Sequence, residues 1–149
     1  MRLAQASDLD TVVALTNEAY AVYETVLDGP PIPVTEDYVP HIARGNVWLL
    51  ELEGKAAGLI VIETEPDHLL IFSVVVADEF QGRGLGSRLM AWAETLAKKA
   101  GFDALRLYTN ARMTRNIAIY EGMGYREIRR RSNSKRPGWI AVDMEKRLS

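Results

Sequence analysis

A glycine-rich segment at residues 76–87 has the residue types that bind a phosphate group. It reads VADEFQGRGLGS, follows an apolar run and precedes an amphipathic segment. The glycines at 82, 84 and 86 lack a Cβ atom, so a ligand could approach the backbone closely. Their N–H groups, placed at the start of a helix, would form an anion site suited to a phosphate. Arg83 and Arg88 add positive charge beside it.

Three kinds of phosphate site were compared with this segment. A P-loop requires a lysine followed by Ser or Thr after the last glycine, whereas Ser87 and Arg88 follow here. A dinucleotide site requires G-x-G-x-x-G and an acidic residue at the end of the next strand. The third glycine is misplaced for that pattern, and the next strand ends in Thr109 and Asn110. The third kind considered is a turn that binds the pyrophosphate of coenzyme A.

The elements that would position this turn follow from apolar periodicity and capping residues. A helix is expected after Ser7 or Asp8, and a proline-stiffened loop at residues 27–35. A second helix is expected at residues 35–43, capped by Thr35. Further helices are expected at residues 84–100 and 115–123, and strands at 47–51, 57–64, 68–77, 105–109, 125–130 and 139–145. This pattern predicts one α/β domain over residues 1–149, with a mixed sheet and helices on both faces.

Composition limits the classes of function. The chain has 149 residues, which suits one domain, and no cysteine, which excludes disulfides, thiolate metal sites and a cysteine nucleophile. His41 and His68 lack a second ligand at metal spacing, so no metal is expected. The net charge of −2 argues against nucleic acid as a partner. The chain shows neither a membrane span nor a signal peptide, so a cytoplasmic protein is expected.

Two motifs in this order resemble those of the GNAT superfamily of N-acetyltransferases. Gln81-x-x-Gly84-x-Gly86, after three valines at 74–76, resembles the acetyl-CoA-binding motif. Residues 116–125, NIAIYEGMGY, resemble the later motif in which a Tyr precedes a Gly-aromatic pair, and residues 2–10 resemble the first strand and helix. The resemblance covers nearly the whole chain and implies the single-domain GNAT fold, with element order βααβββαβαββ.

The resemblance also implies roles for individual residues. The fourth strand would separate from the fifth near residues 74–76, so that free N–H groups bind the pantetheine arm and polarise the thioester carbonyl. Tyr120 would be the general acid that protonates the leaving thiolate. The implied residues for acetyl-CoA are Val74, Val75, Val76, Gln81, Gly82, Arg83, Gly84, Leu85, Gly86, Ser87 and Asn116. Many members carry an Asn seven residues before the Tyr, but Met113 stands there in this chain.

The general base and the acceptor stay open at this point. Glu63 on the third strand and Glu24 near the first helix are candidate bases, and Ser73 could hold a water instead. The acidic residues Glu24, Asp28, Glu36 and Asp37 favour a cationic amine, whereas the basic stretch at 126–136 favours an anionic acceptor.

The predicted function is transfer of an acetyl group from acetyl-CoA to a primary amine of a small molecule, peptide N-terminus or lysine. The alternatives are a non-catalytic acyl-CoA-binding module and, less favoured, a nucleotide-binding protein. Relatives often pair, so a homodimer is a further expectation.

Overall fold

The computed structural model describes residues 1–23, 30–132, 136 and 138–148. Within them, seven strands form one sheet in the order β1-β2-β3-β4-β5-β7-β6. The strands are β1 (Arg2–Leu3), β2 (Val47–Leu52), β3 (Lys55–Thr64), β4 (Leu69–Val76), β5 (Ala104–Asn110), β6 (Arg126–Ser132) and β7 (Ile140–Arg147). The α-helices are α1 (Leu9–Tyr20), α2 (Ile32–Thr35), α3 (Val39–Ala43), α4 (Leu85–Lys99) and α5 (Thr114–Gly122). Short 3-10 turns η1 (Ala6–Asp8), η2 (Ala21–Tyr23) and η3 (Asp78–Phe80) join them.

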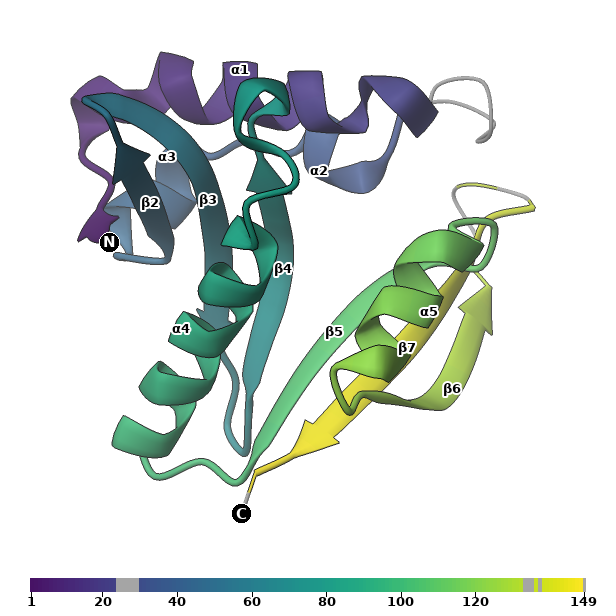
Figure 1. The fold of residues 1–149 in the computed structure, drawn as a ribbon. Coiled ribbons are helices and arrows are strands. Elements are labelled where there is room, and N and C mark those ends of the chain that lie inside the picture. The colour runs from purple at the N-terminus through teal and green to yellow at the C-terminus, as the bar shows by residue number, and fades with distance from the viewer. Residues whose placement is uncertain (24–29, 133–135, 137, 149) are drawn as a thin grey trace.

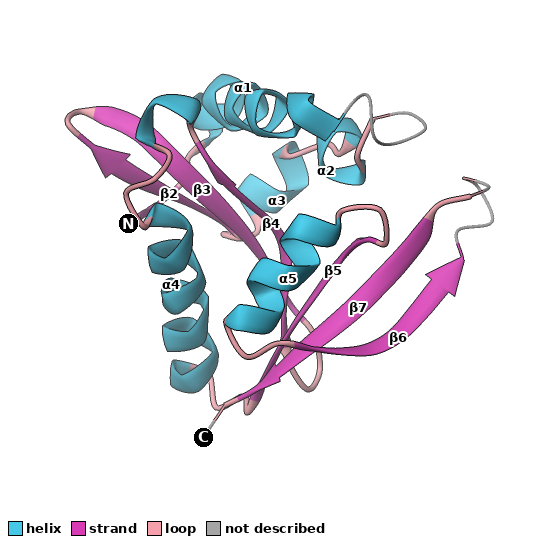
Figure 2. Cartoon of the chain, turned by 45° about the vertical axis from the view of Figure 1, so that its right-hand side comes forward, coloured by secondary structure: helices cyan, strands magenta, loops and turns pink. Residues whose placement is uncertain are grey.

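The mixed sheet and its helices confirm the predicted fold class. β4 and β5 are parallel, and the other paired strands are antiparallel. Six consecutive residues of β3, from Ala57 to Ile62, are buried. Because successive side chains point to opposite faces, such a run requires cover on both faces of the sheet. Helices α1 and α4 both contact β3 and β4, and Figures 1 and 2 show where they lie.

The prediction of one helix at residues 35–43 is wrong. The segment forms two short helices, and Thr35 ends α2 instead of capping a longer helix. Glu36 between them is extended, with φ −75° and ψ 146°. Pro33 and Pro40 each occupy the first turn of a helix, where a missing N–H is tolerated. The prolines therefore start two helices, and the predicted loop is helical over its last four residues.

The parallel strands β4 and β5 pair over only three residues. Leu69, Leu70 and Ile71 face Leu105, Arg106 and Leu107, and the register stops there. On the other edge of β4, the partner of Val61 is Ser73 while the partner of Ile62 is Ile71, so Phe72 is an extra, bulged residue. A bulge bends its strand and raises the local twist. Figure 1 shows β4 and β5 diverging from their shared end, which confirms the predicted separation.

Candidate active site

The glycine-rich turn places the start of α4 beside the end of β4. Gly84 caps the helix in the left-handed conformation, with φ 75° and ψ 17°. Gly82 also has a positive φ, of 80°. The first helical bond runs from the Arg88 N–H to the Gly84 oxygen at 3.2 Å, so the amides of Leu85, Gly86 and Ser87 precede it. Such amides and the helix dipole favour an anion.

Gly86 lies in the first turn of α4, and its φ is not positive. A Cβ built on it would meet no atom within 4 Å. Neither the backbone conformation of Gly86 nor the side chains and strands packed around it therefore require a glycine at this position. Glycine destabilises a helix relative to alanine, so the open space is consistent with a ligand that approaches the backbone there.

Two other predicted residues hold this turn in place. The Gln81 side-chain amide donates to the Val76 oxygen at 3.0 Å and so fastens the turn to the end of β4. Arg83 lies with its guanidinium 5.1 Å from the centre of the Phe80 ring, and is 3.7 Å from Glu53. Phe80 is 1% exposed and anchors η3 in the core. Gln81 therefore has a structural role besides the predicted cofactor contact.

The backbone of β4 presents alternate residues to its unpaired edge. The Ala77 N–H donates to the oxygen of Ala57, a residue of β3, at 2.8 Å. Because the direction of the N–H groups alternates along a strand, Val74 and Val76 direct theirs away from β3. Val75 instead points its main chain toward β3, where it is paired with Leu59. Of the three valines, only Val74 and Val76 therefore have main-chain groups at the edge facing the separated β5.

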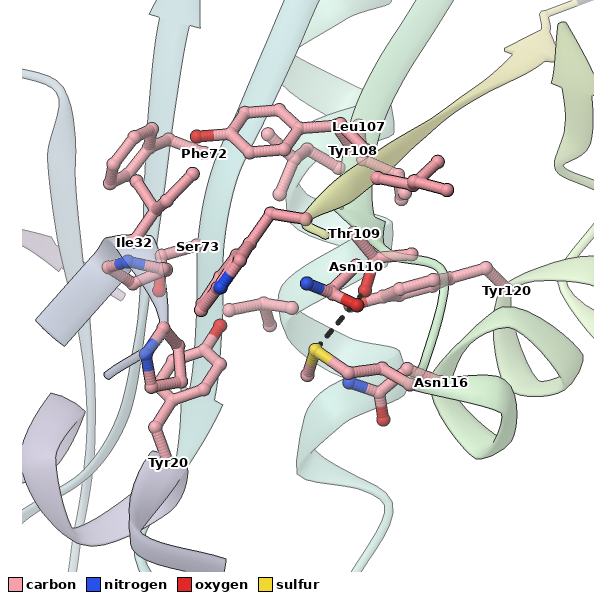
Figure 3. Close-up of a pocket in the computed structure, with 18 residues that line it drawn as sticks. Tyr20, Ile32, Phe72, Ser73, Leu107, Tyr108, Thr109, Asn110, Asn116 and Tyr120 are labelled. Carbon is pink, nitrogen blue, oxygen red and sulfur yellow. Dashed lines mark hydrogen bonds between the residues drawn. The ribbon is translucent and has the colours of Figure 1, made fainter. Parts of the chain in front are cut away.

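A pocket lies between the separated parts of β4 and β5, and we call it the β4–β5 pocket (Figure 3). Residues 71–74 of β4 form one wall and residues 107–110 of β5 the other. The remaining lining residues come from α1, the segment around α2, α5 and its preceding loop, and β7: Tyr20, Pro31, Ile32, Pro33, Met113, Asn116, Tyr120, Trp139, Ile140 and Ala141. Most of these side chains are apolar, so the pocket suits an acyl-pantetheine arm.

Tyr120 reaches this pocket from α5. Figure 3 shows its ring extending from the helix toward Thr109 and the middle of the pocket. Burial is the main cause that raises the pKa of Tyr120, and Tyr20, Tyr125 and Tyr23 add to the rise. The phenol is therefore protonated at neutral pH and can donate a hydrogen bond. Its ring lies edge-on to that of Tyr125, with centroids 6.1 Å apart.

Asn116 lines the same pocket, but its side chain has a partner within the chain. The Tyr23 hydroxyl donates to Asn116 Oδ1 at 3.0 Å. This bond joins the turn after α1 to α5 across the pocket. Met113, at the position where many members carry an Asn, is 6% exposed, and its sulfur accepts from the Thr109 hydroxyl at 3.6 Å. Met113 therefore packs in the pocket wall.

The candidate bases differ in whether they line the β4–β5 pocket. Glu63 is opposite Leu70 in the β3–β4 register and is not among the residues that line the β4–β5 pocket. Its charge nevertheless acts on Tyr108, which does line the pocket. Ser73 is 3% exposed and lines the pocket. Glu24 lies outside the described residues.

Several aromatic residues have roles that the sequence did not separate. Trp139 is buried at 8% exposed and also lines the pocket, with the Arg136 guanidinium 4.4 Å from the centre of its ring. Tyr20 also lines the pocket, whereas Tyr38 is in the core and donates to the Pro33 oxygen. Tyr108 contributes a pocket wall that sequence reasoning missed, because only the separation of β4 and β5 makes it accessible.

Comparison with known proteins identifies the family. The acetyltransferase (GNAT) family model matches residues 11–125, which include the glycine-rich turn, β4, β5 and α5. The chain belongs to the GNAT acetyltransferase family. As in the predicted family fold, the turn at α4 and the separated strands lie next to each other.

Relatives are similar to this chain in fold and in sequence. The PaiA N-acetyltransferase of Thermoplasma acidophilum, solved in complex with coenzyme A, matches with a TM-score of 0.78 and 16% identity, over 99% of this chain and 97% of that one. The ribosomal protein bS18-alanine N-acetyltransferase of Escherichia coli is 30% identical over 84 residues, 56% of this chain and 57% of that protein. The uncharacterized N-acetyltransferase YvbK of Bacillus subtilis is 24% identical over 102 residues. The chain covers less than two thirds of the length of either curated relative.

Among the described residues, no group of three or more His, Cys, Asp or Glu side chains could hold a metal ion. In the same part of the chain, no helix is long and apolar enough to cross a membrane.

Proposed function

We propose that this protein transfers an acetyl group from acetyl-CoA to a primary amine by direct attack. The observation that carries the proposal is the end of β4–β5 pairing at Ile71 and Leu107, because it opens a pocket along β4, the strand that leads into the glycine-rich start of α4. A diphosphate at that helix end and a thioester along β4 would occupy neighbouring parts of one site. The coenzyme A in the Thermoplasma relative and the names of the curated relatives support this reading.

The protein would bind the cofactor mainly through main-chain N–H groups. The amides of Leu85, Gly86 and Ser87 would bind the pyrophosphate, with Arg83 and Arg88 nearby. The Val74 and Val76 N–H groups would bind the pantetheine arm and the thioester carbonyl. A donor fixed at the carbonyl oxygen stabilises the charge that develops there, because it needs no reorganisation during the reaction.

The reaction would then proceed with Tyr120 as proton donor. The amine nitrogen forms a bond to the carbonyl carbon, the carbon–sulfur bond breaks, and the electron pair leaves on sulfur. Tyr120 gives its proton to that sulfur, and the proton of the attacking nitrogen restores the phenol. A thiol is a stronger acid than a phenol, so proton transfer from Tyr120 to the thiolate alone would be unfavourable in free energy. The proton returned by the attacking nitrogen offsets that cost.

The acceptor amine must lose a proton before it attacks. An alkylamine with a pKa near 10.4 is almost wholly charged at pH 7, whereas an α-amino group with a pKa of about 8 is partly neutral. Glu63 or a water held by Ser73 would accept that proton. A small amine, a peptide N-terminus or a lysine each remains a possible acceptor in this proposal, and a bS18-alanine acetyltransferase among the relatives supports a peptide N-terminus.

The test compares Tyr120→Phe with Tyr125→Phe, measuring release of the coenzyme A thiol over a panel of amines and acetyl-CoA affinity by calorimetry. Tyr125 is a matched control because it neighbours Tyr120 but does not line the pocket. We expect turnover of Tyr120→Phe to fall by about 10²-fold or more, as for loss of a general acid, with unchanged affinity. Full activity in this variant would remove Tyr120 from the chemistry. Binding of acetyl-CoA without thiol release by the unaltered protein would favour the non-catalytic module.

A further inference from the structure

A second hollow lies on the face of β5, β7 and β6, and we call it the charged groove. Besides Tyr108, its charged and titratable lining residues are Glu65, His68, Arg106, Arg129, Arg131 and Asp143. The groove shares Ile32, Leu107, Tyr108 and Ala141 with the β4–β5 pocket. A molecule whose amine enters the pocket past these shared residues would therefore extend along the groove.

The groove presents guanidinium groups to the solvent and keeps its best-paired carboxylate beneath them. Arg131 binds Asp143 through Nε at 2.7 Å and Nη2 at 2.6 Å, and Arg129 binds the same carboxylate through Nε. The Asp143 side chain is 9% exposed, whereas those of Arg129 and Arg131 are 62% and 47% exposed. Two positive charges thus share one buried negative charge. Among the described residues, Arg129 binds Asp143 through Nε alone and Arg131 through Nε and Nη2, so each guanidinium has further N–H donors beyond these bonds.

The charge of Asp143 is stable over a wide pH range. Burial acts to raise its pKa, but the hydrogen bonds from Arg131 and Arg129 outweigh burial, and the pKa is lowered overall. The carboxylate is therefore ionised at neutral pH and holds both arginines in place. A fixed pair of guanidiniums loses less conformational entropy on binding an anion than two free side chains would.

Tyr108, at the junction of the pocket and the groove, lies within reach of charges of both signs. Burial is the main cause that raises the pKa of Tyr108 to about 12, the carboxylates of Glu63 and Glu36 add to the rise, and Arg131 opposes it. The Arg131 guanidinium is 6.0 Å from the centre of the Tyr108 ring. Arg131 therefore stands beside Tyr108, at the point where the pocket and the groove meet.

We propose that Arg131 and Arg129 bind an anionic group of the acceptor, so that the preferred acceptor carries a carboxylate or phosphate a short distance from its reactive amine. This rests on the proposed acetyl transfer and adds the class of acceptor to it. The amine would lie in the β4–β5 pocket, and the anion over the guanidiniums of the groove.

The test uses matched amidated dipeptides, Ala-Glu against Ala-Gln and Ala-Asp against Ala-Asn, which differ in one carboxylate, and β-alanine against its amide as the small-molecule arm. Both acetylation and equilibrium binding to the coenzyme A complex are measured. We expect the acidic member of at least one arm to be favoured roughly tenfold in kcat/KM and in binding, as for a charge-assisted hydrogen bond. Raising the salt concentration should reduce this preference, because the guanidiniums are exposed.

Variants of Arg131 then test whether this side chain recognises the anionic group. Arg131→Gln should bring the acidic-to-amide ratio close to one, and Arg131→Lys should keep part of the preference. Arg130→Gln is the matched control, since Arg130 is also exposed on β6 but pairs with Glu127 and does not line the groove. Equal ratios for acid and amide in the unaltered protein, or equal effects of Arg131→Gln and Arg130→Gln, would overturn the inference. Acetylation of amines without such a preference would refute the inference alone, whereas acid-selective binding without any acetylation would refute only the proposed reaction.

Discussion

Substitution of Gly86 by alanine should stabilise the protein and weaken coenzyme A binding at the same time. The new methyl group would meet no atom within 4 Å and would sit on a residue whose φ is not positive. Glycine is up to about 1 kcal/mol less favourable than alanine in a helix. For a domain of about 150 residues, a gain of that size raises the melting temperature by roughly 2–4 °C.

The binding effect has the opposite sign because the same methyl group would occupy the approach to the first turn of α4. A phosphate oxygen would have to lie about 2.9 Å from an amide nitrogen to be hydrogen-bonded. Displacing it would weaken one or two charge-assisted bonds of about 1.5–3 kcal/mol each. The loss of one such bond raises the dissociation constant for coenzyme A roughly 10- to 100-fold.

The assay pairs a thermal melt without ligand with calorimetric titration of coenzyme A. Gly122→Ala is the matched control, because Gly122 is also a helical glycine, in α5, with nothing within 4 Å of a built Cβ. It should raise the melting temperature without changing affinity. A Gly86→Ala protein that melts higher and binds coenzyme A as tightly as the unaltered protein would refute the placement of the pyrophosphate at this helix start.

Two further predictions concern stability. Gly58→Ala should reduce the free energy of unfolding by about 1–3 kcal/mol and so lower the urea concentration at the unfolding midpoint. The reason is that the new Cβ would lie 2.7 Å from the Val75 oxygen and 3.2 Å from Leu89 Cδ1. An unchanged midpoint would contradict this packing. The hydrogen bond from Arg2, with a second from the Gln5 N–H, lowers the pKa of Asp8 from 3.8 to about 2. The stabilisation that ionised Asp8 gives to the folded state is therefore present above about pH 4 and lost as pH falls toward about 2. Asp8→Asn should make the free energy of unfolding less dependent on pH over that window. An unaltered slope of that free energy against pH would argue against the Arg2–Asp8 pairing.

The features that the sequence determined are local in the chain. The glycine spacing at 82, 84 and 86, followed by an amphipathic run, predicted the turn and the start of α4 within one residue. Apolar runs and turn residues predicted the strands from β2 onward along the chain, and the resemblance to the GNAT motifs implied the family fold. These signals depend on backbone preferences over a few neighbouring residues, so they can be detected without knowing what lies across the sheet. The split of α2 from α3 was missed because Pro33 was assigned to a non-helical loop and Pro40 to the interior of one helix, whereas each sits in the first turn of its own helix.

Only the tertiary structure decided which residues face the chemistry. The bulge at Phe72 and the end of pairing at Ile71 depend on the register of β4 against two neighbours that are distant in sequence. That register exposes Val74 and Val76 to the cleft and turns Val75 toward β3. The fold also brings Trp139, just before β7, and Tyr20 from α1 to one pocket. Pairing of β6 with β7 similarly sets Arg129 and Arg131 over Asp143, because a strand's register, not its composition, determines which side chains share a face.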